Sequence, residues 1–327
     1  MSGSGLPAKP FHVVRGGDPG ALRGAVVAIG NFDGVHRGHR AVIAAALSRA
    51  QALGRKTAAL TFTPHPRLFL RPQDALFQLS SERNKLRLLA ATGLDGAIVM
   101  TFDAALAATS AEDFIAKILA GRFGIGGAAI GFDFHFGKNR QGSPAFLTEQ
   151  GARLGFAVDI VPPLEDEGRP VSSGAVRAAL SGGKVVEATE LLGAPWFVSG
   201  EVVHGGKRGR ELGFPTANLK LDPACGLKHG IYAVRVQVGG KRHDGVASFG
   251  VRPMFDDGAP LLEVFLFDFD GDLYGQTIDV AFIGWMRPEQ KFDSIEVLKH
   301  QMAADSAKAR ETLARAGQSF PVLGELP

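Results

Sequence analysis

The chain has 327 residues, which is more than one ordinary core holds and suits two domains. Hydrophobic residues make up 45% and charged residues 21%, so the composition is globular and excludes a disordered chain. The formal net charge is only +3 and the lysines and arginines are dispersed. We therefore expect anionic small molecules as partners, and no nucleic acid.

The cysteine content and the hydropathy of the chain indicate where in the cell the protein is expected. Cys225 is the only cysteine, so no disulfide can form within the chain, and we expect a cytoplasmic protein. Residues 1–10 show no basic segment followed by an apolar one, so we expect no signal peptide. The longest apolar runs, such as Ala41–Leu47, are far shorter than the roughly 20 residues of a membrane span, so we expect no membrane partner.

Strand-like and helix-like segments alternate through the first half of the chain. The predicted strands are Val26–Ile29, Thr57–Phe62, Ala97–Phe102, Ala128–Gly131 and Phe156–Val161. The predicted helices between them are Arg40–Leu53, Ser80–Thr92, Ala111–Gly121 and Pro144–Leu154. This alternation predicts an α/β domain with a parallel sheet and right-handed crossovers.

The second half has a different texture. Two short helices, Ser172–Leu180 and Val185–Leu192, precede strand-like runs, which are Phe197–His204, Ile231–Val238, Leu261–Phe269 and Thr277–Ile283. The alternation in Ile231–Val238 predicts a half-buried strand, and Asp270-Gly271 predicts a tight hairpin between the last two runs. Ser294 begins a last amphipathic helix. We expect a small antiparallel barrel, with domains at 1–185 and 186–327.

The string GNFDGVHRGH at residues 30–39 follows the first predicted strand and opens the first long helix. In a parallel α/β sheet this is the edge where ligands bind. The glycines let backbone amides approach a phosphate, and the helix N-terminus adds positive charge. His36 and His39 could both point at one phosphate and stabilise the charge that builds as pyrophosphate leaves. The alternative is a tight turn with two exposed histidines, which the position after the strand disfavours.

This string resembles the signature of the HxGH nucleotidyltransferases, in the form found in the FAD synthetase half of prokaryotic bifunctional riboflavin kinase/FAD synthetases. TFTPHPR at 61–67 and GFDFHFG at 131–137 resemble two further segments of that family. The resemblance implies a Rossmann-like domain whose nucleotide site comprises Gly30, Phe32, Asp33, Gly34, His36, Gly38 and His39. It also implies an FMN site at His65, Asp133 and Phe134, although a proline-fixed turn would explain His65 and loop packing the other two.

The segment SSGAVR at 172–177 resembles the SSTxxR signature of the same family. There a helix start and an arginine bind the ATP phosphates, which implies that role for Ser172, Ser173 and Arg177. Gly174 stands where the family usually has Thr or Ser, so one hydroxyl is lost. A narrower alternative is therefore a riboflavin kinase whose FAD synthetase half is impaired.

A second motif spans residues 202–218. Thr216 and Asn218 are two residues apart, so on a strand they share one face, and their oxygens suit Mg²⁺ bound to nucleotide phosphates. Taken alone, these residues could line a turn, and the basic loop 205–210 could be a solvated surface. The segment resembles the GxxxGRxLGFPTAN motif of riboflavin kinases. That resemblance implies Mg²⁺ at Thr216 and Asn218, and a phosphate site that also includes Gly205, Lys207, Arg208, Gly209, Arg210, Gly213 and Pro215.

Glu263 is the one acid inside the apolar run 261–267. Composition alone favours an outward-facing strand residue, but the family resemblance implies the general base that deprotonates the ribityl hydroxyl. RPEQKF at 287–292 resembles another family segment and implies that Arg287, Glu289 and Phe292 help to cover the flavin. Met254 replaces the Thr of the family's RPTF segment, which changes local packing.

Together these features predict a Rossmann-like nucleotidyltransferase domain followed by a six-stranded antiparallel riboflavin-kinase barrel with a C-terminal helix. The implied substrates are ATP with Mg²⁺, riboflavin and FMN, and flavoproteins would be clients for the products. Two other classes compete with this reading. One is a flavin-binding protein with vestigial sites, and the other is a nucleic-acid-binding protein that relies on Lys207–Arg210.

Overall fold

The computed structural model describes residues 9–166, 168–204, 213–251 and 260–327. The chain divides into two compact units. The first comprises Met1–Leu76, Ser80–Val171 and Val322–Pro327, and the second comprises Phe77–Leu79 and Ser172–Pro321. The expected domain boundary at residue 185 stays a prediction. Within the described ranges, no helix is both long and apolar enough to cross a membrane.

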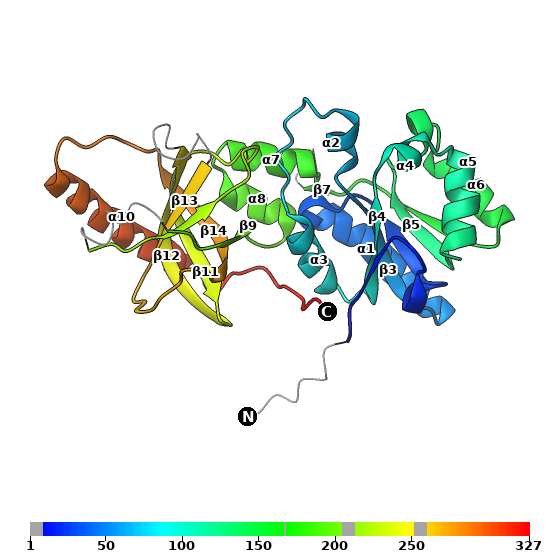
Figure 1. The fold of residues 1–327 in the computed structure, drawn as a ribbon, viewed down its shortest axis with the longest axis horizontal. Coiled ribbons are helices and arrows are strands. Elements are labelled where there is room, and N and C mark those ends of the chain that lie inside the picture. Colours follow the sequence, from blue (N-terminus) through cyan, green and yellow to red (C-terminus); the bar gives the residue numbers. More distant parts are fainter. Residues whose placement is uncertain (1–8, 167, 205–212, 252–259) are drawn as a thin grey trace. The chain divides into compact units, whose positions relative to one another are not determined.

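The first unit contains a six-stranded sheet in which all strands are parallel (Figure 1). Its order is β1-β4-β3-β2-β5-β6. The strands are β1 (His12–Arg15), β2 (Val26–Ile29), β3 (Thr57–Thr63), β4 (Gly96–Thr101), β5 (Gly127–Gly131) and β6 (Ala157–Val161). The predicted parallel sheet is confirmed, and β1 is an edge strand that the sequence pattern missed.

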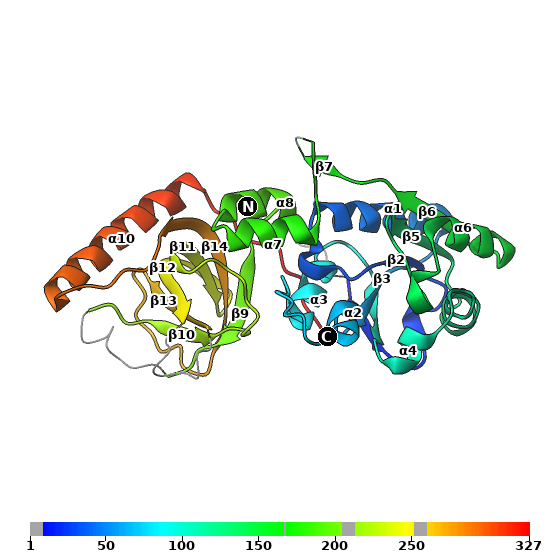
Figure 2. The same ribbon diagram turned by 90° about the horizontal axis from the view of Figure 1, so that it is seen from above.

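Helices cover both faces of this sheet. They are α1 (Arg37–Leu53), α2 (Pro66–Leu70), α3 (Glu82–Ala90), α4 (Ala104–Ala108), α5 (Ala111–Asp113), the π-helix η3 (Phe114–Arg122) and α6 (Pro144–Arg153). Val27 and Ile29 of β2 pack against η3 and α6 in one apolar cluster. Helix α1 contacts the same sheet along β2, β3, β5 and β6, as Figure 2 shows. A small hairpin, β7 (Glu165–Asp166) and β8 (Arg169–Pro170), follows β6.

The strand order positions the ligand edge. Strand β2 lies between β3 and β5, so the chain crosses to opposite sides of β2 as it builds the two halves of the sheet. In open α/β sheets, ligands bind at such a reversal, beyond the carboxyl ends of the strands. The loops that leave β2, β3 and β5 carry the three family segments of the first half, at residues 30–39, 61–67 and 131–137.

The second unit is a six-stranded antiparallel sheet of order β10-β13-β12-β11-β14-β9. Its strands are β9 (Phe197–Glu201), β10 (Ala217–Lys220), β11 (Gly230–Val238), β12 (Lys241–Val251), β13 (Pro260–Leu266) and β14 (Thr277–Arg287). A bridge between Val203 and Asn218 joins the two ends, so the sheet is a nearly closed barrel. Helices α7 (Ser173–Ser181) and α8 (Val185–Leu192) precede it, and α10 (Ile295–Arg315) packs along β11, β12 and β14.

Two expectations about the barrel were wrong. Asp270-Gly271 does not form a hairpin between neighbouring strands, because β13 pairs with β10 and β12 while β14 pairs with β9 and β11. Strand β11 is not half-buried: Arg235, on its expected outer face, is only 1% exposed. Its guanidinium donates to Asp244 and to the carbonyls of Leu313 and Ser319, so the end of α10 covers it.

Candidate active sites

The loop after β2 presents the two histidines of the first site. It turns sharply, with positive φ at Phe32 (52°), Gly34 (78°) and Val35 (45°). His36 then caps α1, because its Nδ1 accepts from the backbone amide of His39 at 3.3 Å. The two imidazole rings stack with their centroids 3.6 Å apart. The two rings therefore lie together at the sheet edge, and their contact with a phosphate stays a prediction.

Gly38 lies where a side chain would crowd both the His36 ring and the chain at Val171. A Cβ at this position would lie 3.1 Å from the His36 ring and 3.1 Å from the Val171 carbonyl oxygen. Contacts this short require neighbours to shift, and here one neighbour is a ring in the site and the other is backbone. The glycine between the histidines thus lets the helix start lie close to the chain at Val171.

Phe32 and Asp33 belong to the same string but point inward. The Phe32 ring is fully buried and meets His39 edge-on, with centroids 5.2 Å apart. Asp33 is 4% exposed, and its carboxylate accepts from the backbone amide of Ser80 at 3.0 Å and from the Ser80 hydroxyl at 3.3 Å. Their expected nucleotide contacts stay predictions, and the observed contacts of both side chains lie within the protein.

The residues predicted for FMN lie on the loops after β3 and β5. His65 caps α2 by accepting from the amide of Arg67 at 3.2 Å. Asp133 is exposed, and its carbonyl lies 3.0 Å from Nδ1 of His135. Phe134 stacks on Phe136 with centroids 5.5 Å apart, at the edge of the apolar core. The loops share the sheet edge, and the FMN contacts themselves stay predictions.

The residues of the SSGAVR segment begin helix α7, in the second unit. The Ser172 hydroxyl caps the helix by accepting from the Ala175 amide at 3.1 Å, which confirms the predicted helix start. Arg177 Nε donates to the Phe77 carbonyl at 2.6 Å. A Cβ on Gly174 would meet only the Ser172 hydroxyl, at 3.6 Å, so nothing in the packing of this unit requires glycine there.

A cavity of about 450 Å³ lies between the strands of the barrel and helix α10, and residues of both line it. Its wall contains one row of residues that are paired in register across neighbouring strands: Asn218 with Glu263, Glu263 with Ser248, Ser248 with Ile231, and Ile231 with Arg287. Cross-strand partners project from the same face of a sheet, so the row brings Glu263 and Asn218 side by side at the cavity. Glu263 therefore projects away from the barrel core, because its neighbours Leu262 and Val264 are fully buried on the other face of β13, and its outward side is the wall of the cavity.

Thr216 and Asn218 also line this cavity. Asn218 is 4% exposed, and its side-chain NH₂ donates to the Thr216 carbonyl at 3.3 Å. That bond uses the nitrogen of the amide, so Oδ1 is the atom suited to a hard cation. Among the described residues, no group of three or more acidic, histidine or cysteine side chains could hold a metal. A site with few protein oxygens fits Mg²⁺, which is commonly bound by one or two protein ligands together with substrate phosphates.

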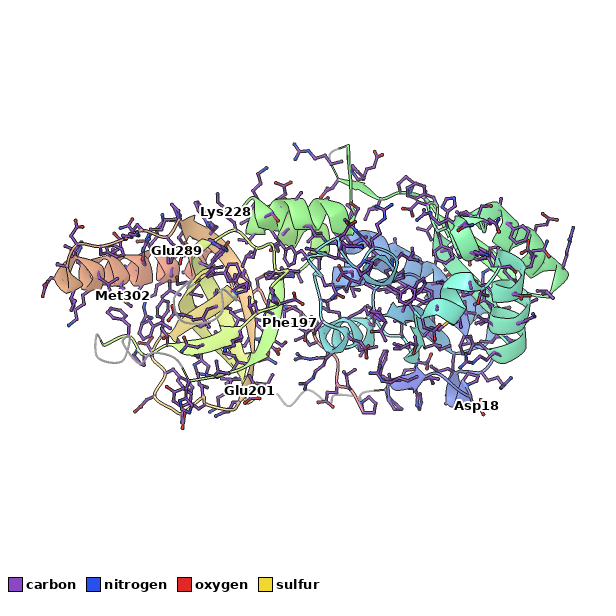
Figure 3. The ribbon with its side chains drawn as sticks, turned by 45° about the horizontal axis from the view of Figure 1, so that its top comes forward. Asp18, Phe197, Glu201, Lys228, Glu289 and Met302 are labelled. Carbon is purple, nitrogen blue, oxygen red and sulfur yellow. The ribbon has the colours of Figure 1, made fainter. Side chains whose placement is uncertain are left out.

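The predicted flavin-covering residues line the same cavity. Arg287 forms a two-point ion pair with Asp305 of α10, with its Nε 2.9 Å from Oδ1 and its Nη2 2.6 Å from Oδ2. Its guanidinium lies 5.9 Å from the centre of the Phe292 ring. The Glu289 carboxylate rests against the backbone of Gly250, and Figure 3 labels this residue and Met302 on the side of the barrel that carries α10.

Part of the second motif falls outside the described residues, namely Gly205, Lys207, Arg208, Gly209 and Arg210, and so does Met254 of the segment compared with RPTF. Gly213 has a φ of +87°, and Pro215 lines the cavity beside Thr216. Sequence reasoning missed several cavity residues, which are Ile231, Ser248, Leu298, Met302, Asp305 and Ser306. For the residues of α10, the amphipathic pattern of the last helix was the one available signal. Ser248 lies on β12, a strand that the sequence pattern did not predict.

Comparison with known proteins assigns the family. The FAD synthetase family matches residues 18–175, and the riboflavin kinase family matches residues 192–313. The bifunctional riboflavin kinase/FMN adenylyltransferase of Pseudomonas fluorescens is 41% identical over 88% of this chain and 93% of its own length. The protein of that name from Escherichia coli K12 is 39% identical over 88% and 92%. The chain belongs to this bifunctional family.

A solved structure supports the architecture. The crystal structure of a protein called macrolide-efflux protein, from Streptococcus pneumoniae, matches with a TM-score of 0.82 and 32% identity. The match covers 91% of this chain and 98% of the other. The family's bifunctional protein from Bacillus subtilis is 35% identical over 87% of this chain and 91% of its own length. The likenesses therefore extend through both units.

Proposed function

We propose that the FAD synthetase part of the chain adenylylates FMN to FAD and that the riboflavin kinase part phosphorylates riboflavin to FMN, both with ATP. Membership of the bifunctional family, with a match in each half of the chain, supports this division. The observation that carries the kinase assignment is the cavity wall in which Glu263 lies beside Asn218.

In the kinase reaction, Glu263 takes the proton from the terminal ribityl hydroxyl as that oxygen attacks the γ-phosphorus of ATP and ADP leaves. Thr216 and Asn218 would hold Mg²⁺, which would neutralise charge on the nucleotide phosphates. The apolar part of the cavity wall would bind the flavin ring, with Phe292 and the α10 residues Leu298 and Met302 covering it. Position and electrostatics then provide most of the rate enhancement.

In the adenylylation reaction, an oxygen of the FMN phosphate attacks the α-phosphorus of ATP and pyrophosphate leaves. The stacked His36 and His39 would donate to the oxygens of the transferring group, where negative charge builds. Ser172, Ser173 and Arg177 would hold the departing pyrophosphate. No covalent enzyme intermediate is required.

Two single substitutions test the division of labour. Glu263→Gln should abolish FMN formation from riboflavin and leave the conversion of FMN to FAD near the wild-type rate, because it removes only the base in the barrel. His36→Ala should do the reverse. Each variant serves as the folded control for the other, and the two flavin products can be separated by chromatography. Loss of both activities in a folded variant would refute the assignment.

The kinase-only alternative rests on Gly174. Incubating the protein with FMN, ATP and Mg²⁺ decides it, since the absence of FAD would show that the FAD synthetase part is inactive. A side chain would fit at Gly174 within its own unit, so the glycine does not indicate a distorted helix start. This favours the bifunctional interpretation. The cytoplasmic location, the flavoprotein clients and the absence of nucleic-acid binding stay predictions.

A further inference from the structure

A buried polar network lies beneath the loop that carries the histidines. Lys85 of α3 is only 8% exposed. Neither of the two proposed sites includes it, and the reaction steps above do not use it. Its Nζ donates to the Thr61 hydroxyl at 3.2 Å, the Phe62 carbonyl at 3.2 Å and the Asn31 carbonyl at 3.4 Å. The Thr61 hydroxyl itself donates to the Asn31 carbonyl at 3.1 Å. One ammonium group thus ties the loop after β2 to the end of β3.

Ser80 fixes the same loop from a second side. Its hydroxyl accepts from the Gly34 amide at 3.0 Å and donates to the Asp33 carboxylate at 3.3 Å, while its own amide donates to that carboxylate at 3.0 Å. Ser80 is 7% exposed and Asp33 is 4% exposed, so these bonds are shielded from water. Every atom in this set is paired with a partner distant in sequence.

The loop needs such support because its backbone is costly. Phe32 and Val35 have side chains and positive φ, a conformation that L-residues avoid and that Val, with its branched Cβ, avoids most strongly. Residues of this kind persist only where the surroundings fix them. His36 follows Val35 directly, so the conformation of the loop sets where the His36 ring lies.

The hydrogen-bond partners of Lys85 favour its charged form, although burial favours the neutral one. Burial lowers the pKa of Lys85, whereas the carboxylates of Asp33 and Glu82 favour its protonated form. A neutral amine would have two N–H donors for the three oxygens, which are Thr61 Oγ1 and the carbonyls of Asn31 and Phe62. The charged form satisfies all three.

We infer that Lys85 and Ser80 are positioning residues for FMN adenylylation, which act by holding the loop 30–36 so that His36 and His39 meet the transferring phosphoryl group. This inference rests on the adenylylation proposed for the FAD synthetase part of the chain. Because the histidines stabilise charge that appears only in the transition state, and the residues proposed for FMN lie on other loops, a displaced loop lowers kcat and leaves FMN binding nearly unchanged. Displacements of about 1 Å can reduce catalysis by roughly a hundredfold.

The test compares Lys85→Met and Ser80→Ala with wild type in the full-length protein. We expect kcat for adenylylation to fall by about 10- to 100-fold in both, with KM for FMN changed less than about threefold. The kinase kcat, measured on the same samples, should equal that of wild type. Leu147→Ala is the matched control, because Leu147 is fully buried in α6 and packs on the sheet face that faces η3. It should lower the stability of the unit without lowering kcat.

The outcomes separate three cases. A folded Lys85→Met or Ser80→Ala variant with wild-type kcat overturns the inference, as does an equal loss of kcat in Leu147→Ala, which would show a general effect of stability. If Lys85→Met does not fold, Ser80→Ala decides, since it removes only one oxygen. A wild-type protein that makes no FAD refutes the proposed adenylylation itself, whereas wild-type activity with unaffected variants refutes only the network's role.

Discussion

The ion pair between Arg287 and Asp305 should decide how firmly α10 is held against the kinase cavity. The side chain of Asp305 is 8% exposed and that of Arg287 is 19% exposed. The Gln301 side-chain amide donates a further bond to Asp305 at 3.0 Å. Asp305→Asn keeps the shape of the side chain but leaves the Arg287 guanidinium without its counter-charge. Breaking a buried pair by removing one partner costs about 3–5 kcal/mol.

The partial exposure of the Arg287 side chain and its bond to the Pro288 carbonyl reduce this cost. We therefore expect Asp305→Asn to lower the free energy of unfolding by about 2–3 kcal/mol. With a urea m-value of about 2 kcal/mol per molar, the unfolding midpoint should fall by roughly 1–1.5 M. Asp268→Asn is the matched control. Asp268 also forms a two-point pair with an arginine of α10, Arg310, but this pair is exposed on both sides, so its loss should leave the midpoint unchanged.

Tryptophan fluorescence can follow this unit alone, because the only two tryptophans, Trp196 and Trp285, both belong to it. The urea transition seen by fluorescence therefore reports the barrel and α10, whatever the first unit does. Equal midpoints for Asp305→Asn and Asp268→Asn would refute the reasoning. So would a wild-type midpoint in Asp305→Asn, because the buried pair would then contribute nothing that an amide cannot replace.

Three further outcomes are expected. Gly38→Ala should lower adenylylation at least about tenfold and spare the kinase, because the new methyl displaces the His36 ring; separate rate assays check this. Gly174→Ser should change the free energy of unfolding, obtained from the fluorescence transition, by less than about 0.5 kcal/mol, since the added Cβ meets open space beside Ser172. It should not lower the rate of FAD formation. Burial raises the pKa of Cys225 to about 11, so at pH 8 a thiol reagent should label native protein far more slowly than urea-unfolded protein.

Local pattern was enough to predict the parallel sheet. Its central strands are continuous apolar runs, buried on both faces, and glycines or helix caps follow them. Strand β1 was missed because His12–Arg15 is short and half-exposed, and it takes its partners from β4 at the sheet edge. The helix after Ser110 was predicted in place but not in kind, since the chain continues from α5 into the π-helix η3.

The barrel was less predictable because its strands depend on distant partners. Strand β12 (Lys241–Val251) starts with charged residues and contains two glycines, so its own residues do not indicate a strand. Arg235 fits the polar position of an alternating strand, yet the carbonyls of Leu313 in α10 and of Ser319 after it allow its burial. Asp270-Gly271 has the composition of a hairpin turn, but pairing across the whole sheet overrides that local preference.

The two sites differ in how much of their geometry the sequence contains. In the first unit, the histidines are three residues apart on a helix start, so the motif itself brings them together. In the barrel, Asn218 and Glu263 become neighbours only through the register of β10 on β13. A slip of one residue in that register would turn Glu263 to the other face. The proposed kinase site therefore depends on the register of strand pairing, while the proposed adenylylation site would depend on the buried bonds that we infer to hold one loop.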